Sequence, residues 1–126
     1  MTGVQTCALP IFEKQLGFQL AGDDVFVNIA GGIEVDEPAA DLGVIAAIAS
    51  SFRNLQVPPE TAVFGEVGLT GEVRGVLQAQ ARAREAQTLG FKKLILPESN
   101  KKGLEKLLGI RVVGVKNLEQ AMDELF

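Results

Sequence analysis

The sequence predicts an α+β domain, a mixed β-sheet with packed helices, and three patterns support this. Residues 24–35 (DVFVNIAGGIEV) are rich in β-branched side chains and alternate, as strands do. Residues 39–52 are apolar almost all round, which is typical of a helix buried on most sides. In the second half, short apolar runs alternate with helical segments. The 126 residues suit a single domain.

The element boundaries follow from local signals. Asp36 and Glu37 place negative charge where the buried helix begins, and Pro38 suits its first turn. After the helix, consecutive prolines break the chain before a second predicted strand at 61–67 and a tight turn at 69–72. The remaining predicted elements are helices at 77–89, 100–108 and 118–126, and strands at 93–96 and 110–115.

Caps support the helices of the second half. Gly90 is expected in the C′ position after the helix at 77–89. Asn100 can cap the helix at 100–108, and Gly109 would end it. Asn117 and Gln120 resemble a capping box for the last helix.

Composition limits the classes of site that the chain can hold. Its net charge of −4 argues against a general nucleic-acid clamp, although a local basic patch remains possible. It has no histidine and a single cysteine, so the usual zinc and iron sites are excluded, and no Walker loop occurs. We interpret Asp36, Glu37 and Asp41 as favourable charge at a helix start rather than a magnesium site. We therefore expect no cofactor, no metal and no membrane span.

The first eleven residues (MTGVQTCALPI) show neither strand nor helix periodicity. They resemble translated sequencing-adapter read-through, and we expect residues 1–11 to be a non-native or disordered leader. The folded domain is then expected over 12–126, and Cys7 would carry no functional information.

Nucleophilic catalysis would need a serine and a lysine, because no histidine is present to act as the base. No lysine lies between Lys14 and Lys92. Ser50 and Ser51 fall late in the buried helix, where bonding to backbone carbonyls is the usual role. Ser99 falls at a helix entry, where capping is usual. We expect none of the three to be catalytic.

Two stretches are specific: DEPAADLGVIAAIASS (36–51) and VFGEVGLTGEVRGVLQAQARAREAQTLGFKKLILP (63–97). Together with VFVNIAGGIEV they resemble the C-terminal domain of the RadA (Sms) family of bacterial DNA repair ATPases. The resemblance runs from about Phe12 to the end of the chain. That domain is similar in fold to the proteolytic domain of Lon proteases, which has the ribosomal protein S5 domain 2-like fold.

The Lon resemblance implies a degenerate catalytic dyad. Where the proteases have Pro-Ser-Ala-Gly, with the serine as nucleophile, this chain has Pro38-Ala39-Ala40-Asp41. The protease hairpin Gly-Glu-x-x-Leu-x-Gly corresponds to residues 65–71, and counting forward places the lysine position on Gln80. The resemblance therefore implies that this domain is not an enzyme.

The RadA resemblance also implies a context. Parent proteins look like ring-forming motors with a zinc finger and a RecA-like ATPase, acting in recombinational repair and branch migration. ATP, magnesium and zinc are then expected only in those other parts of the parent, because this chain carries no Walker motif. We expect a cytoplasmic scaffold domain that forms a homo-oligomeric, hexameric ring and handles DNA within the parent.

Three alternatives remain open. The chain could bind DNA directly through basic residues, and the candidates are Arg74, Arg82, Arg84, Lys101 and Lys102. It could retain serine peptidase activity. It could also be the Lon-like domain of another ATPase, such as a magnesium-chelatase or ComM-like protein.

Overall fold

The computed structural model describes residues 37–107 and 109–126. The predicted leader at 1–11, the predicted strand at 24–35 and Asp36 lie outside the described residues. Three strands, β1 (Thr61–Val63), β4 (Lys93–Pro97) and β5 (Arg111–Val115), form a parallel sheet in the order β1-β4-β5. Two more, β2 (Glu66–Val67) and β3 (Val73–Arg74), form an antiparallel hairpin.

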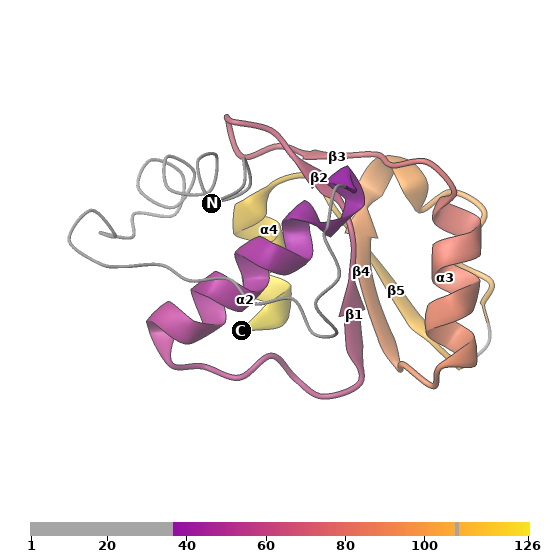
Figure 1. Cartoon of the computed structure of the whole chain (residues 1–126). Coiled ribbons are helices and arrows are strands. Elements are labelled where there is room, and N and C mark those ends of the chain that lie inside the picture. The colour runs from indigo at the N-terminus through magenta and orange to yellow at the C-terminus, as the bar shows by residue number, and fades with distance from the viewer. Residues whose placement is uncertain (1–36, 108) are drawn as a thin grey trace.

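The helices lie on both faces of the parallel sheet (Figure 1). One face is covered by α2 (Asp41–Arg53) and α4 (Leu118–Leu125), and the other by α3 (Ala79–Thr88). Short 3₁₀ helices, η2 (Pro38–Ala40) and η3 (Glu98–Asn100), precede α2 and follow β4. The predicted α+β class is confirmed. Within the described residues, no helix is long and apolar enough to cross a membrane.

The central strand β4 separates two hydrophobic cores. Ile95 packs on one face with side chains of α2 and α4, among them Leu42 and Leu125. Leu94 and Leu96 point to the other face and pack with Ala83 and Ala86 of α3. A strand covered by helices on both faces must be apolar at every position, which is why residues 94–96 read as a continuous apolar run rather than an alternating one.

The buried helix differs from its prediction at the start. Its first turn is the 3₁₀ helix η2, capped by Glu37, whose Oε1 accepts a bond from the Ala39 N–H at 3.3 Å. At the other end, Asn54 has a left-handed φ of 53° and the Leu55 N–H bonds to the Ser50 carbonyl at 3.0 Å. A polar left-handed residue of this kind is a common helix terminator.

The predicted strand at 61–67 is interrupted, and Gly65 is the reason. Its φ of 157° takes the chain out of β1 before β2 begins. Its N–H donates to the Ala39 carbonyl at 2.8 Å, and its carbonyl accepts from the Leu42 N–H at 3.0 Å. The glycine backbone thus holds the start of α2 against the sheet.

The predicted helix at 100–108 is wrong. After η3, residues 102–106 form turns, and Gly103 has a left-handed φ of 85° that a helix does not accommodate. Asn100 does not cap a helix. Its Oδ1 accepts from the Val76 N–H at 2.8 Å, and its Nδ2 donates to the Val76 carbonyl at 3.2 Å. This side chain therefore satisfies the backbone of the loop before α3.

The glycine cap predicted for α3 is confirmed, and so is the Asn117 cap of α4, although the return bond of its capping box goes to Lys116 rather than to Asn117. Gly90 has a φ of 89° and donates to the Gln87 carbonyl, while Phe91 donates to the Ala86 carbonyl, a Schellman motif. At α4, the Gln120 N–H bonds to Asn117 Oδ1 at 2.9 Å, and Gln120 Oε1 accepts from the Lys116 N–H at 2.8 Å.

Candidate functional site

The predicted serine position lies inside an apolar cluster. Ala39 belongs to η2 and is only 3% exposed. Its methyl group is part of the core that includes Phe64 and Ala83, and its carbonyl accepts the bond from the Gly65 N–H. The residue is therefore held by its backbone, and its side chain belongs to the same apolar cluster as side chains of α3.

The predicted lysine position lies on the outside of α3. Gln80 is exposed, whereas Ala79, Ala83 and Ala86 form the inner stripe that packs on the sheet. Residues at i, i+3, i+4 and i+7 share one face of a helix, so this stripe defines the buried side and leaves Gln80 next to it. The fold brings the two dyad segments together, but it buries one position and exposes the other.

An ion pair ties the same two segments together. Arg82 of α3 reaches Glu37, with Nη2 3.3 Å from Oε1, and its Nε donates to the Leu77 carbonyl at 3.0 Å. Glu37 also caps η2, so one carboxylate serves both elements. Partly exposed pairs of this kind contribute little free energy, but this one limits how η2 and α3 can separate. Sequence patterns gave no sign of it, because its partners are 45 residues apart.

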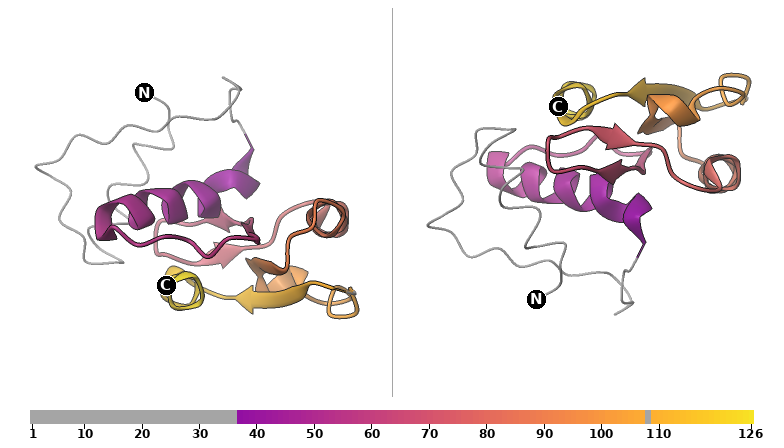
Figure 2. Two further views of the ribbon diagram at one scale, coloured as in Figure 1. Left: turned by 90° about the horizontal axis from the view of Figure 1, so that it is seen from below. Right: turned by 90° about the horizontal axis from the view of Figure 1, so that it is seen from above.

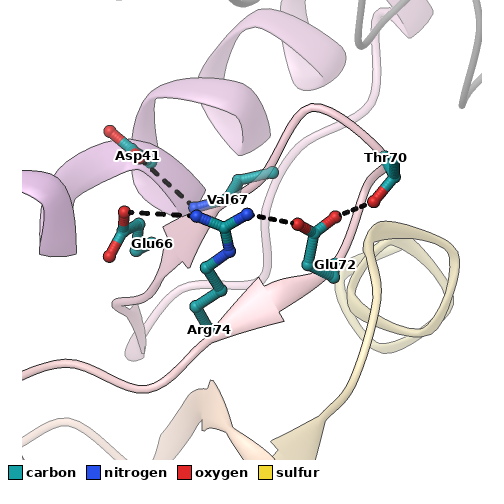
Figure 3. A network of polar contacts seen from close by, with 6 residues as sticks. All are labelled: Asp41, Glu66, Val67, Thr70, Glu72 and Arg74. Atoms are coloured by element: carbon teal, nitrogen blue, oxygen red, sulfur yellow. Dashed lines mark hydrogen bonds and ion pairs between the residues drawn. The ribbon is translucent and has the colours of Figure 1, made fainter.

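A polar network covers the β2–β3 hairpin (Figure 3). Glu66 and Arg74 face each other across the two strands, with Arg74 Nη1 3.9 Å from Glu66 Oε1. Arg74 Nη2 lies 2.6 Å from Glu72 Oε1, and the Thr70 hydroxyl donates to Glu72 Oε2. The hydroxyl of Thr70, above all, together with Arg74, lowers the pKa of Glu72 to about 2.

Asp41 connects this hairpin to the start of α2. Its Oδ2 accepts from the Val67 N–H at 3.3 Å. Burial raises the pKa of the Asp41 carboxyl, the bond from Val67 opposes this, and the negative charge of Glu66 raises the pKa further. Asp41 was expected only to place favourable charge at a helix start. It lies in the first turn of α2 and also joins this helix to the hairpin, at an electrostatic cost that the sequence did not indicate.

The Glu72 network predicts a pH-dependent effect of Glu72→Gln. A carboxyl whose pKa is lower in the folded state stabilises the fold above its unfolded pKa, near 4.5, and this contribution fades as pH falls toward 2. Urea unfolding should therefore show the variant less stable than the parent chain at pH 7, with the difference shrinking by pH 3. The same substitution in a Thr70→Val background should have a smaller effect. A difference independent of pH would contradict the assignment.

Asp41 acts in the opposite direction. Because its pKa is raised in the folded state, the folded chain takes up this proton more readily than the unfolded chain. Its contribution is therefore unfavourable at neutral pH and is relieved as pH falls through its folded pKa. The Glu72 measurement compares two chains that both keep Asp41, so this contribution cancels between them.

The five predicted DNA contacts do not form one uniform patch. Arg74 and Arg82 are held by carboxylates of the hairpin and of η2. Arg84 and Lys102 are exposed, and within the described part of the chain neither forms an ion pair, whereas Lys101 is half-buried. Arg82 and Arg84 are also two residues apart on a helix, so they point to different sides.

Of the serines considered as nucleophiles, Ser50 has a structural hydrogen bond. The Ser50 hydroxyl donates to the Leu55 carbonyl, as expected for a serine late in a helix. Ser99 is exposed within η3. Across residues 37–107 and 109–126, no group of three or more His, Cys, Asp or Glu is placed to hold a metal ion.

Comparison with known proteins agrees with this architecture. Residues 14–125 match the Lon protease (S16) C-terminal proteolytic domain. The DNA repair protein RadA of Bacillus subtilis is 45% identical over 114 residues, covering 90% of this chain and 25% of the relative. RadA of Pseudomonas aeruginosa is 45% identical over 118 residues, covering 94% and 26%. RadA of Streptococcus pyogenes serotype M1 is 41% identical over 118 residues, covering 94% and 26%.

The chain thus spans about a quarter of the length of these relatives. The predicted resemblance to RadA is confirmed by relatives that bear that name, and the predicted Lon-like fold by the matching family. The chain belongs to the Lon protease (S16) C-terminal proteolytic domain family, in a form similar to that of DNA repair proteins named RadA.

Proposed function

We propose that this chain is a non-catalytic, Lon-like scaffold domain of a cytoplasmic RadA-like DNA repair ATPase. In the parent it would help to form a hexameric ring that acts in recombinational repair and branch migration. The observation that carries the proposal is the burial of Ala39, at the predicted serine position, in the apolar core that also contains side chains of α3.

The chemistry at both dyad positions supports a non-catalytic role. A methyl group cannot attack a carbonyl, and Ala39 is surrounded by apolar side chains rather than open to a substrate. The amide of Gln80 cannot accept a proton as a lysine base does, and it faces solvent. A nucleophile needs its base within hydrogen-bond reach. Alanine supplies no nucleophile, and glutamine supplies no base.

The surrounding framework supports a scaffold rather than a damaged enzyme. Gly65 still joins the first turn of the buried helix to the sheet through two backbone bonds. Asp41 adds a bond to the hairpin, and the Glu37–Arg82 pair joins η2 to α3. A domain held together in this way presents fixed outer surfaces, which is what an assembly role requires. Relatives named RadA favour this parent over a magnesium-chelatase or ComM-like one.

Oligomerisation tests the proposal. The 126-residue chain should sediment as a species larger than a monomer at micromolar concentration, and deleting this domain from the full-length parent should weaken or alter its ring. ATPase activity of the domain-deleted parent would be measured as a control, because it shows that the remainder of the protein still folds. A strictly monomeric domain whose deletion leaves the ring intact would contradict the proposal. Labelling of the domain by a serine-reactive probe would contradict its non-catalytic part.

Direct DNA binding is the second candidate, and it is favoured by Arg84 and Lys102, which are exposed and form no ion pair with any residue that the structure describes. Arg84→Ala with Lys102→Ala should weaken a low-salt DNA mobility shift and reduce its salt dependence, because each phosphate contact releases counterions. Lys116→Ala, which removes an exposed charge near α4, should leave the shift unchanged. If the unsubstituted 126-residue chain gives no DNA mobility shift even at low salt, this candidate is ruled out.

A further inference from the structure

The described part of the chain has no net charge, but its charges are strongly separated. Residues 74–111 carry nine basic and three acidic side chains, a net charge of +6. The rest of the described chain, 37–73 and 112–126, carries two basic and eight acidic side chains, a net charge of −6. Where the fold keeps the two sets of charges apart, they create regions of opposite potential.

The charges of α3 and of the turn region lie on one side of the parallel sheet and those of α4 on the other, whereas Glu37, Glu66 and Glu72 lie beside basic residues of 74–111. The turn region between η3 and β5 packs with α3 in one core through Leu104 and Ile110, whereas α4 packs with α2 in the other. Figure 2 shows α3 and this turn region at one end of the molecule and α4 at the other. We call these the α3 face and the α4 face.

Internal ion pairs neutralise only some of these charges. Arg74, Arg82 and Lys93 are paired with carboxylates from the acidic part of the chain, Lys93 with Glu124 at 3.2 Å. Six basic residues remain outside these pairs: Arg84, Lys92, Lys101, Lys102, Lys106 and Arg111. On the α4 face, Glu119 and Asp123 are exposed and, within the described residues, unpaired. Both faces therefore keep charge available for a partner.

Exposed apolar side chains accompany the charges of the α3 face. On the α3 face, Leu77 and Leu89 flank α3 and are 84% and 66% exposed. Phosphate contacts use cationic and polar groups, whereas protein interfaces combine an apolar centre with a charged rim. The combination fits a protein partner better than a nucleic acid.

We infer that the α3 face of one copy of this chain binds the α4 face of a second copy, head to tail. The evidence is the charge complementarity of the two faces together with the exposed leucines of the α3 face. Contact between two different surfaces generates a ring or a filament rather than a closed two-fold dimer. The inference rests on the proposed oligomeric role and specifies the surfaces that carry it.

Two charge-reversal variants of the 126-residue chain test the inference. In the first, Arg84, Lys102 and Lys106 become Glu, so that both faces are acidic. In the second, Glu119 and Asp123 become Lys, so that both faces are basic. Sedimentation should show that each variant alone associates at least about tenfold more weakly than the parent chain, because like charges now meet. Circular dichroism would verify that both variants fold.

Mixing the two variants is the decisive step. The α4 face of the first and the α3 face of the second are unchanged, so that contact is the natural one, and the reversed faces are again complementary. Association should therefore return in the mixture. It should weaken in both the mixture and the parent chain when salt rises from about 0.05 to about 0.5 M. Lys116→Glu, which adds negative charge near α4, should not weaken association.

The possible failures are distinguishable. If the parent chain associates and both variants associate equally well, these surfaces are not the interface, although the proposed scaffold role stands. If the mixture is not restored although each variant is weakened, the head-to-tail arrangement is wrong. If the first variant loses only a DNA shift and keeps its self-association, the α3 face binds nucleic acid instead. If the unsubstituted 126-residue chain is monomeric at every salt concentration, both proposals are overturned.

Discussion

Gly65→Ala is expected to lower the free energy of unfolding by about 2–4 kcal/mol, because it adds backbone strain to overpacking. A Cβ at this position would lie 3.1 Å from Val73 Cγ1 and 3.3 Å from the Pro97 ring, and the φ of 157° is rarely adopted by other residues. Moving the backbone to relieve these contacts would break the bonds to Ala39 and Leu42. Urea unfolding monitored by circular dichroism measures the loss.

Gly43→Ala is the matched control. Gly43 lies within α2, where the nearest atom to an added Cβ is Val63 Cγ2 at 3.6 Å, an ordinary contact. Because glycine is a poor helix former, this substitution should be neutral or stabilise the chain by up to about 1 kcal/mol. If both substitutions had the same small effect, Gly65 would not hold α2 to the sheet as described.

Ile95→Ala is expected to cost about 2–5 kcal/mol, the range for removing a buried aliphatic side chain and leaving a cavity. Ile95 is 0% exposed, lies on the central strand, and contributes to the core between the sheet and the helices α2 and α4. Because α2 and α4 both contact this core, neither helix can move to fill the cavity without losing its other contacts in the core.

The smaller change Ile95→Val should cost about 0.5–1.5 kcal/mol, because it removes a single methylene. Chemical unfolding of both variants, with the denaturant dependence compared to the parent chain, measures the two losses. A valine variant as unstable as the alanine variant would mean that shape, rather than buried volume, limits this site.

Much of the fold could be predicted from the sequence because its signals are local. The apolar run at 94–96, the Schellman glycine Gly90 and the Asn117 cap each act within a few residues, and all three agree with the structure. The assignment to an α+β, Lon-like domain depended on such signals together with the resemblance, and it is confirmed.

The predictions that failed depended on distant partners. The interruption of the strand at 61–67 comes from bonds between Gly65 and residues of η2 and α2, more than twenty positions earlier. The helix at 100–108 was predicted because Asn100 can cap, but its amide bonds instead to Val76, 24 residues away. No local pattern records which of two uses a side chain will have.

The environment of the candidate site could not be predicted from the sequence, and the assignment of its positions stays a prediction. The resemblance placed the dyad positions on Ala39 and Gln80, and the structure describes both. Their burial and exposure, and the Glu37–Arg82 pair beside them, result from packing between segments about 40 residues apart. The charge of Arg82 made it a DNA candidate in the sequence, whereas its ion pair became visible only in three dimensions.

The parallel arrangement of β1, β4 and β5 also has a consequence for how fast the chain folds. Thr61 pairs with Lys93, 32 positions later, and Lys93 pairs with Arg111, 18 positions further on. Each pairing closes a long loop before any of its contacts form, and chains dominated by such non-local contacts fold slowly. We therefore expect the β2–β3 hairpin, which needs only a short loop, to form early, and the three-stranded sheet to limit the folding rate.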